Sequence, residues 1–224
     1  MAEIIFDEKK HQYTVDGVVY PSVTDILEHL TAPGYGKVNP AILEEAKQRG
    51  TAVHELTEAI DYGMPPEEIE DGLAGYALAY LRFLADYDVE WELIEHRFYE
   101  PTMGFCGTID RVGKIDGEDC VLDIKTTSSP STEQKIAVCC QTAAYAYGVW
   151  GWTEEHGVQT MDECTKRYAL YLHSNGEYEF MNCSDYEWSK CFNGFSLFKE
   201  LCKLHKDIAS IKKTRAKRKK EESQ

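Results

Sequence analysis

The chain has 224 residues, of which 43% are hydrophobic and 12% are aromatic. This length and composition allow one domain with a substantial core, which excludes a disordered chain, a collagen and a disulfide-stapled miniprotein. The formal net charge is −15, although residues 206–224 carry eight Lys or Arg against three acids. An acidic body repels nucleic acid at long range, so a nucleic-acid partner would require locally clustered cations or a bound metal.

Membrane insertion and secretion are not expected. No run approaches the ~18 apolar residues of a membrane helix, and the opening MAEIIFDEKK carries acids where a signal peptide is basic and then apolar. The eight cysteines have irregular spacings and no CxxC motif, so we expect reduced thiols that mostly pack in the interior. These features predict a cytoplasmic protein with no membrane contact.

The N-terminal third is predicted to form a hairpin followed by three helices. HQYTV and VVYPS are two β-prone runs separated by an Asp-Gly pair that suits a tight turn. Ser22 or Thr24 can cap a first helix, which the Pro33–Gly36 loop ends. A second helix starts at Pro40 and contains His54, and a third covers roughly residues 66–87.

The rest of the chain is predicted to alternate strands and helices. The order is strands at 91–100, 104–115 and 118–127, a helix of about twenty residues from near Ser131, strands at 167–173 and 177–182, and a last helix from about Ser184 into the basic tail. This order predicts an α/β single domain, a central mixed β-sheet flanked by helices. We place it at residues 1–205 and expect 206–224 to be a helical extension or disordered.

The hairpin around Asp116-Gly117 places charged side chains together. If this pair is a two-residue turn, cross-strand partners have numbers that add up to 233, so Asp110 lies opposite Asp123 and Thr108 opposite Lys125. Opposed Cβ atoms are ~4.5–5.5 Å apart and like charges there repel, so we expect a cation between the aspartates. Strand alternation directs Asp123 and Lys125 to one face and the intervening residues to the core.

Such a polar patch suits metal-assisted hydrolysis. A solvated sheet face with one exposed Lys–Asp pair, worth ~0–1 kcal/mol, would show the same alternation and stays an alternative. Two adjacent aspartates between strongly apolar neighbours favour a site instead. Carboxylate oxygens suit Mg²⁺ or Mn²⁺, and a lysine beside them can position or deprotonate a water for attack on phosphorus.

Four ordered motifs carry a family resemblance. They are RGTAVH at 49–54, GTID at 107–110, LDIK at 122–125 and QTAAY at 141–145. Together they resemble the RecB-type branch of the PD-(D/E)XK nuclease superfamily, and HQYTVDGVVYPSVTDIL resembles the opening of phage-type exonucleases and of the mitochondrial genome-maintenance exonuclease in that branch. The resemblance covers residues 11–145. It implies a restriction-endonuclease-like core and a divalent-metal-dependent DNA nuclease, of phage exonuclease type, in recombination or repair.

The resemblance assigns roles to individual residues. Asp110, Asp123, the backbone carbonyl of Ile124 and His54 become ligands of Mg²⁺ or Mn²⁺, and the imidazole would favour Mn²⁺ somewhat. Lys125 becomes the catalytic lysine. A lone histidine within a helix is more often a hydrogen-bonded structural residue than a ligand, and only the family context of RGTAVH favours the ligand role for His54.

Further residues are assigned to the substrate. Gln141 and Tyr145 match the QxxxY element, which is thought to orient the lysine and contact the DNA backbone. Their i, i+4 spacing puts them on one helix face, although a plain helix-surface pair has the same spacing. Arg49 and Thr126 are expected at the DNA as well, with Arg49 alternatively a solvated side chain. Cations near Arg97 and Arg111 and in the tail are expected to add contacts, and the tail is alternatively only solubilising. Glu95, an acid near the predicted sheet, is not assigned to the site.

Departures from the family pattern limit the prediction. Cys164, Cys183, Cys191 and Cys202 are 19, 8 and 11 apart, unlike the closely spaced trio that holds an iron–sulfur cluster in some relatives, so no iron–sulfur cluster is expected. No GxxxxGK[ST] motif is present for ATP-driven unwinding. The expected partner is DNA with linear or single-stranded ends, and family analogy adds a single-strand annealing protein. A catalytically silent DNA-binding or assembly module and a sequence-specific endonuclease remain alternatives, and the oligomeric state is open.

Overall fold

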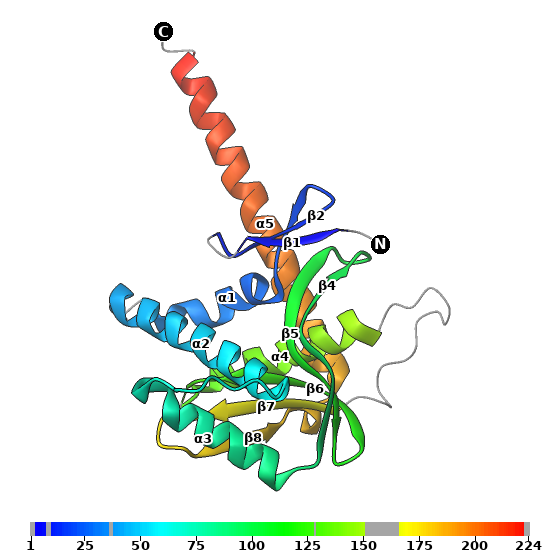
Figure 1. Cartoon of the computed structure of the whole chain (residues 1–224). Coiled ribbons are helices and arrows are strands. Elements are labelled where there is room, and N and C mark those ends of the chain that lie inside the picture. The colour runs from blue at the N-terminus through cyan, green and yellow to red at the C-terminus, as the bar shows by residue number, and fades with distance from the viewer. Residues whose placement is uncertain (1–2, 8–9, 36–37, 128, 151–165, 222–224) are drawn as a thin grey trace.

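The computed structural model describes residues 3–7, 10–35, 38–127, 129–150 and 166–221. Its main feature is a five-stranded mixed sheet in the order β4-β5-β6-β7-β8, preceded by a small three-stranded antiparallel sheet (Figure 1). The five strands are β4 (Val89–Glu100), β5 (Phe105–Ile115), β6 (Glu118–Lys125), β7 (Lys166–Leu172) and β8 (Tyr178–Asn182). The predicted α/β fold with a central mixed sheet is confirmed.

One pair of strands makes the sheet mixed. Strands β6 and β7 run parallel, whereas the other neighbours in the sheet are antiparallel. A parallel pair needs a crossover connection, and helix α4 (Thr132–Trp150) lies in that connection. The carboxyl end of β6 therefore meets α4, which brings the LDIK and QTAAY motifs together.

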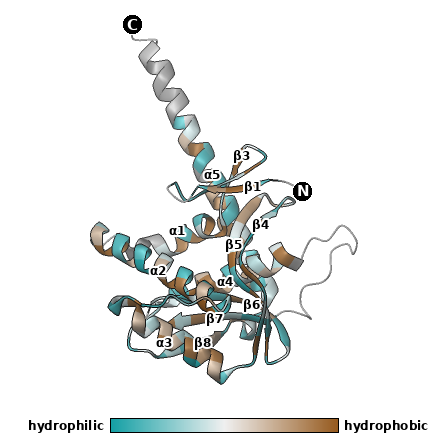
Figure 2. Cartoon of the chain, viewed as in Figure 1, coloured by the Kyte–Doolittle hydropathy of each residue, from teal (hydrophilic) through white to brown (hydrophobic). Residues whose placement is uncertain are grey.

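Helices cover both faces of the sheet. Helices α2 (Pro40–Asp61) and α3 (Asp71–Asp86) pack on one face, and α1 (Val23–Tyr35) and α4 pack on the other together with the start of α5 (Trp188–Glu221) (Figure 1). Hydrophobic residues are concentrated along the central strands between these layers (Figure 2). The sheet is thus buried on both sides, which agrees with the continuous burial of β6 from Cys120 to Ile124.

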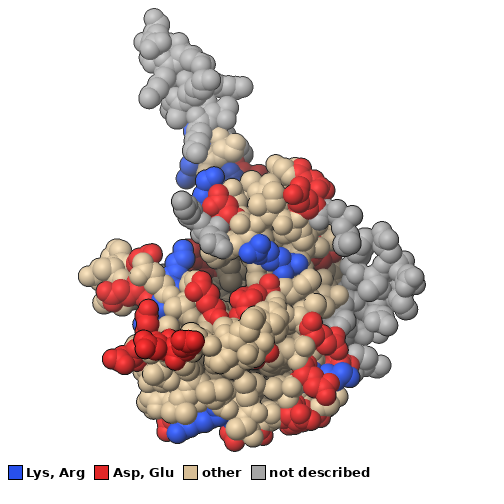
Figure 3. Space-filling model, in the orientation of Figure 1, with Lys and Arg blue, Asp and Glu red and all other residues tan. Residues whose placement is uncertain are grey.

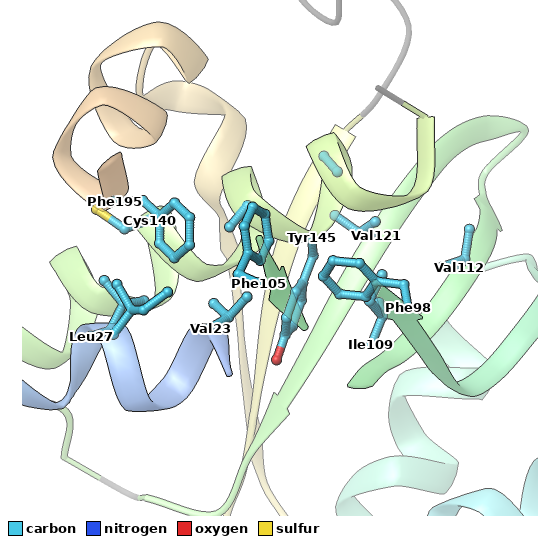
Figure 4. Packing of buried hydrophobic residues seen from close by; sticks show 13 residues of the cluster. Val23, Leu27, Phe98, Phe105, Ile109, Val112, Val121, Cys140, Tyr145 and Phe195 are labelled. Atoms are coloured by element: carbon cyan, nitrogen blue, oxygen red, sulfur yellow. The ribbon is translucent and has the colours of Figure 1, made fainter. Parts of the chain in front are cut away.

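The core on the α4 face surrounds one functional residue. Val23, Phe98, Phe105 and Phe195 belong to this cluster, and the ring of Tyr145 lies among them with its hydroxyl pointing out of the cluster (Figure 4). Burying an aromatic ring while its hydroxyl reaches a polar partner fixes both position and direction. The core therefore aims Tyr145 at the end of β6.

The N-terminal segment confirms the hairpin and adds a strand. Strands β2 (Gln12–Val15) and β3 (Val18–Tyr20) flank the predicted Asp-Gly turn, with positive φ at both turn residues. Strand β1 (Ile4–Asp7), which was not predicted, pairs with β2. Ser22 caps α1, because its Oγ accepts the Asp25 N–H at 2.9 Å and its own N–H donates to Asp25 Oδ2 at 3.0 Å.

Several predicted helix ends were wrong. Helix α1 continues through the predicted stop at Pro33 and ends two residues later, at Tyr35. Helix α3 begins at Asp71 rather than near 66. A short 3₁₀ turn, η1 (Cys183–Asp185), precedes α5, which then continues to Glu221.

The cysteines were expected to be reduced thiols that mostly pack in the interior, and the described ones are. Seven cysteines are described and all are free thiols, of which six are buried; Cys164 lies outside the described residues. Among the helices that the structure describes, none carries an apolar stretch long enough to cross a bilayer.

Candidate active site

The predicted register between β5 and β6 is confirmed. The recorded pairs run from Ile115↔Glu118 to Arg111↔Leu122, so each pair of numbers adds up to 233. The next positions along this register are Asp110 and Asp123. Asp110 Oδ2 accepts a hydrogen bond from the backbone N–H of Ile124 in β6 at 2.5 Å. The two aspartates therefore lie side by side at the point where the ladder ends.

Asp123 is held from two sides. Its side chain is buried, and Lys125 Nζ donates to its Oδ1 at 3.0 Å and lies 2.8 Å from its Oδ2. The Gln141 amide donates to the same Oδ1 at 2.7 Å. Oδ2 is buried and forms an ion pair with the same ammonium. The Asp123 carboxylate is therefore fixed by Lys125 and Gln141 together.

Gln141 and Tyr145 act as one buried unit. Both side chains are buried, and Gln141 Nε2 lies 2.7 Å from Tyr145 Oη. This burial is inconsistent with a solvated helix-surface pair. A glycine makes the arrangement possible, because a Cβ on Gly107 would lie 2.6 Å from Phe98 Cε1 and 3.1 Å from Tyr145 Cε1. The glycine of GTID therefore leaves space for the aromatic rings that set the position of Gln141.

His54 reaches the same point from α2. Its Nδ1 lies 3.2 Å from Glu95 Oε1 and 3.6 Å from Asp110 Oδ1, and its Nε2 lies 3.2 Å from the Ile124 carbonyl oxygen. Both ring nitrogens therefore face acceptors. A neutral imidazole has one N–H, so only the imidazolium satisfies both contacts.

Glu95 was left out of the site by the sequence reasoning, yet it contacts His54. On either side of it β4 pairs with β5 as Ile94↔Arg111 and His96↔Ile109, so Glu95 lies beside Asp110. Its φ is +47°, a left-handed conformation within a strand that costs about 1–3 kcal/mol in a residue other than glycine. Such strain concentrates at functional sites, because the surrounding structure must impose it.

A buried-arginine network lies directly behind the site, and it comprises Arg111, Asp61, Tyr80 and Thr57. The Arg111 guanidinium is fully buried; it donates to Asp61 Oδ2 at 2.5 Å, to Thr57 Oγ1 at 3.1 Å and to Glu95 Oε1 at 3.2 Å. Tyr80 in turn donates to the Asp61 carboxylate. The expectation that Arg111 contacts DNA was wrong, because a guanidinium enclosed between β5 and α2 cannot reach a phosphate.

The donor atoms form a group that fits a metal ion. Among the described residues, His54, Glu95 and Asp110 form a group whose ligand atoms all lie within 4.8 Å of one another. Asp123 interacts electrostatically with both His54 and Asp110, and the Ile124 carbonyl adjoins His54 Nε2. An imidazole with several carboxylates and a carbonyl suits a hard or borderline divalent cation.

Burial and neighbouring charges shift the pKa values of the two aspartates and of His54. Burial is the main cause that raises the pKa of Asp123, to about 6, and Lys125 offsets only part of it. Burial also raises the pKa of Asp110, against the neighbouring His54. For His54, burial alone would lower the pKa, but the carboxylates of Asp110 and Glu95 outweigh it and raise the pKa to about 9. Without a metal, the histidine therefore carries the compensating positive charge.

These residues open into a cavity of about 670 Å³. Figure 3 shows it as a hollow with both acidic and basic side chains at its edges. Its lining includes Lys47, Lys125 and Arg97, whose guanidinium lies over the Phe6 ring. Arg49 and Thr126 line an adjoining cavity of about 570 Å³, to which Lys125 and Gln141 also contribute. Arg49, Thr126, Gln141 and Tyr145, four of the residues predicted to contact DNA, thus line the two cavities at the metal-ligand group.

Comparison with known proteins identifies a family. The family model described as the PD-(D/E)XK nuclease superfamily matches residues 25–173, well over half of the chain. The chain belongs to the PD-(D/E)XK nuclease superfamily. The matched region contains the GTID, LDIK and QTAAY motifs and helix α2 with His54.

More specific relatives are distant. No curated protein matches the chain. Among solved structures it is similar to that titled "Crystal Structure of LHK-Exo in complex with dAMP", with 14% identity and a TM-score of 0.37 over 88% of this chain and 94% of that one. A likeness at that level carries no argument about substrate or mode of cleavage.

Proposed function

We propose that this protein is a divalent-metal-dependent DNA nuclease that hydrolyses phosphodiester bonds, with exonuclease action on linear or single-stranded ends. The observation that carries the proposal is the convergence of His54, Glu95, Asp110, Asp123 and Lys125 on one cavity of a PD-(D/E)XK nuclease fold. The exonuclease mode rests on the motif resemblance, as does a role in recombination or repair.

The donor atoms fit Mg²⁺ or Mn²⁺. Glu95, Asp110 and His54 supply ligand atoms within 4.8 Å of one another, and the buried carboxylate of Asp123 interacts electrostatically with Asp110 and His54. The Ile124 carbonyl completes the set. A divalent ion held there would polarise the scissile phosphate and lower the pKa of a bound water.

The remaining residues position the reacting groups. Lys125, partly exposed to the cavity, can orient the attacking water, and its charge stabilises the developing phosphorane. Gln141 holds Asp123 from behind, so the carboxylate cannot rotate away from the metal-ligand group. Arg49, Thr126 and Lys47 would contact phosphates of the bound strand.

A cleavage assay tests the proposal. End-labelled linear DNA and covalently closed circles are incubated with Mg²⁺ or Mn²⁺, and we expect the linear DNA alone to be degraded. Asp123→Ala and Lys125→Ala should each abolish degradation. The matched control is Asp119→Ala, which removes an exposed carboxylate from the same strand. Asp119 pairs with Lys114 across the hairpin, and the variant should retain wild-type activity.

Any other result of this assay would indicate a different function or a different site. Cutting of closed duplex circles would replace the exonuclease with an endonuclease. Binding of DNA without cleavage under either metal would indicate a catalytically silent module. Wild-type activity in Asp123→Ala or Lys125→Ala would show that the assigned centre is wrong.

A further inference from the structure

Helix α5 carries an uncovered apolar stripe. Beyond its first turns this helix leaves the body of the molecule (Figure 1). Leu197, Leu201, Leu204 and Ile208 are 67%, 55%, 54% and 43% exposed. These values are high for four large aliphatic side chains on a single helix, and a contiguous apolar stripe of this kind marks an interaction surface.

The spacing of the stripe is that of a coiled coil. Successive members are four, three and four residues apart, which corresponds to heptad positions d, a, d and a. On this numbering Phe195 and Cys202 occupy b positions, and Phe198 occupies an e position. Phe195 is buried in the core, Phe198 packs against the same cluster and Cys202 Sγ approaches the Ile26 carbonyl at 3.6 Å, so the body covers the b and e side of the heptad. The a/d seam beside it stays exposed.

The charged residues beside the stripe favour an identical helix as the partner, in the parallel orientation. Position g holds Glu200 and Asp207, and position e of the following heptad holds Lys212; these three side chains are exposed. In a parallel pair of identical helices, g contacts the e position of the next heptad on the partner, which sets Asp207 against Lys212 twice. An antiparallel pair would bring the acidic g positions against each other.

We propose that α5 pairs in parallel with α5 of a second copy of this chain, forming a two-fold homodimer through the seam of Leu197, Leu201, Leu204 and Ile208. A parallel seam is self-complementary, as a closed dimer requires. The proposal is independent of the nuclease assignment.

The surface chemistry disfavours other occupants. Nucleic acid requires cations along its contact, whereas this seam is apolar and flanked by Glu200 and Asp207. A membrane-surface helix needs a broad apolar face with Lys and Arg beside it, and the stripe is narrow with acids beside it. A narrow seam with complementary charge across it fits a second identical helix.

Sedimentation of the full-length chain tests the dimer. The wild type should show a concentration-dependent monomer–dimer equilibrium, and Leu201→Lys combined with Leu204→Lys should be monomeric at every concentration. Because these side chains are exposed in the single chain, the variant should keep the melting temperature that the wild type shows at concentrations where it is monomeric. The matched control is Leu81→Lys, an exposed leucine of α3 that is 48% accessible, which should leave the equilibrium unchanged.

A charge exchange tests identity and direction together. Asp207→Lys and Lys212→Asp should each raise the dissociation constant severalfold, because each creates two like-charge contacts across the seam. The double variant restores opposite charges and should return to the wild-type value. A wild type that stays monomeric at the highest concentration reached, a dimer that survives the lysine substitutions, or a double variant no better than the singles would each overturn the proposal.

Discussion

Metal binding at this site should displace a proton from His54. Both ring nitrogens face acceptors, Glu95 and the Ile124 carbonyl, and the surrounding carboxylates raise the pKa of the imidazole to about 9. A histidine can bind a metal only through an unprotonated nitrogen. At neutral pH the metal-free protein must therefore lose this proton before the imidazole can act as a ligand.

The size of the effect follows from the pKa. A pH of about 7.5 is ~1.5 units below the pKa of the imidazole. Removing the proton at this pH costs about 2 kcal/mol, which weakens metal binding ~30-fold relative to the deprotonated site. The affinity for Mn²⁺ should rise about tenfold per pH unit from about pH 7 and level off near pH 9. Asp123, whose pKa is about 6, is already ionised over that range and adds little.

Isothermal titration calorimetry measures this directly. Mn²⁺ is titrated at about pH 7.5 in buffers with different ionisation enthalpies, and the slope of the observed enthalpy gives the number of protons released, for which we expect about one. His54→Gln should bind Mn²⁺ more weakly and release almost none. His96→Gln is the matched control, because burial lowers the pKa of His96, which is neutral at this pH.

Two results would refute the reasoning. Release of no proton by the wild type would mean that His54 is neutral or does not bind the metal. Equal release by the wild type and His54→Gln would assign the proton to another group. The same raised pKa has a consequence for metal-free stability: the free energy of unfolding in the presence of chelator should fall as the pH rises from about 6.5 to 9, and His54→Gln should reduce that fall.

Three further predictions concern the surroundings of the site. Tyr80→Phe removes a hydrogen bond to Asp61 in the buried-arginine network and should weaken Mn²⁺ binding about tenfold in the same titration. Tyr178→Phe removes a similar bond, from β8 to Asp86 of α3, and should leave the affinity unchanged. Gly107→Ala should lower the free energy of unfolding in urea by about 1–3 kcal/mol because its Cβ would collide with Phe98, while Gly72→Ala, with nothing within 4 Å, should not. Mn²⁺ at about 100 times its Kd should stabilise the wild type by about 2.7 kcal/mol, which a thermal melt with and without chelator detects; an unchanged Tm would contradict a metal site formed by the folded state.

The local sequence determined the hairpin that carries the two aspartates. The turn at Asp116-Gly117 fixes the register of β5 and β6, since a two-residue turn permits one pairing, and alternation then sends Leu122 and Ile124 into the core. The spacing of Gln141 and Tyr145 likewise places them on one helix face. These features depend on residues that are neighbours along the chain, so a periodic pattern was sufficient to predict them.

Element ends were less predictable. Helix α1 continues through Pro33 and α3 starts at Asp71, because tertiary packing and a few terminal hydrogen bonds decide where a helix stops. Strand β1 is a β-prone run of only four residues, IIFD, and so short a run does not by itself indicate which strand it pairs with.

Only the tertiary structure decided the membership of the metal-ligand group. Glu95 lies 41 residues from His54 in the sequence, and its carboxylate reaches the imidazole because β4 pairs with β5 and holds Glu95 at a positive φ that no sequence pattern signals. The same packing buries Arg111 against Asp61, where a charged strand residue was expected to face solvent. The local sequence determines turns, strand register and helix faces, because these depend on residues close together in the chain. Which distant side chains share a cavity depends on how the helices and the sheet pack.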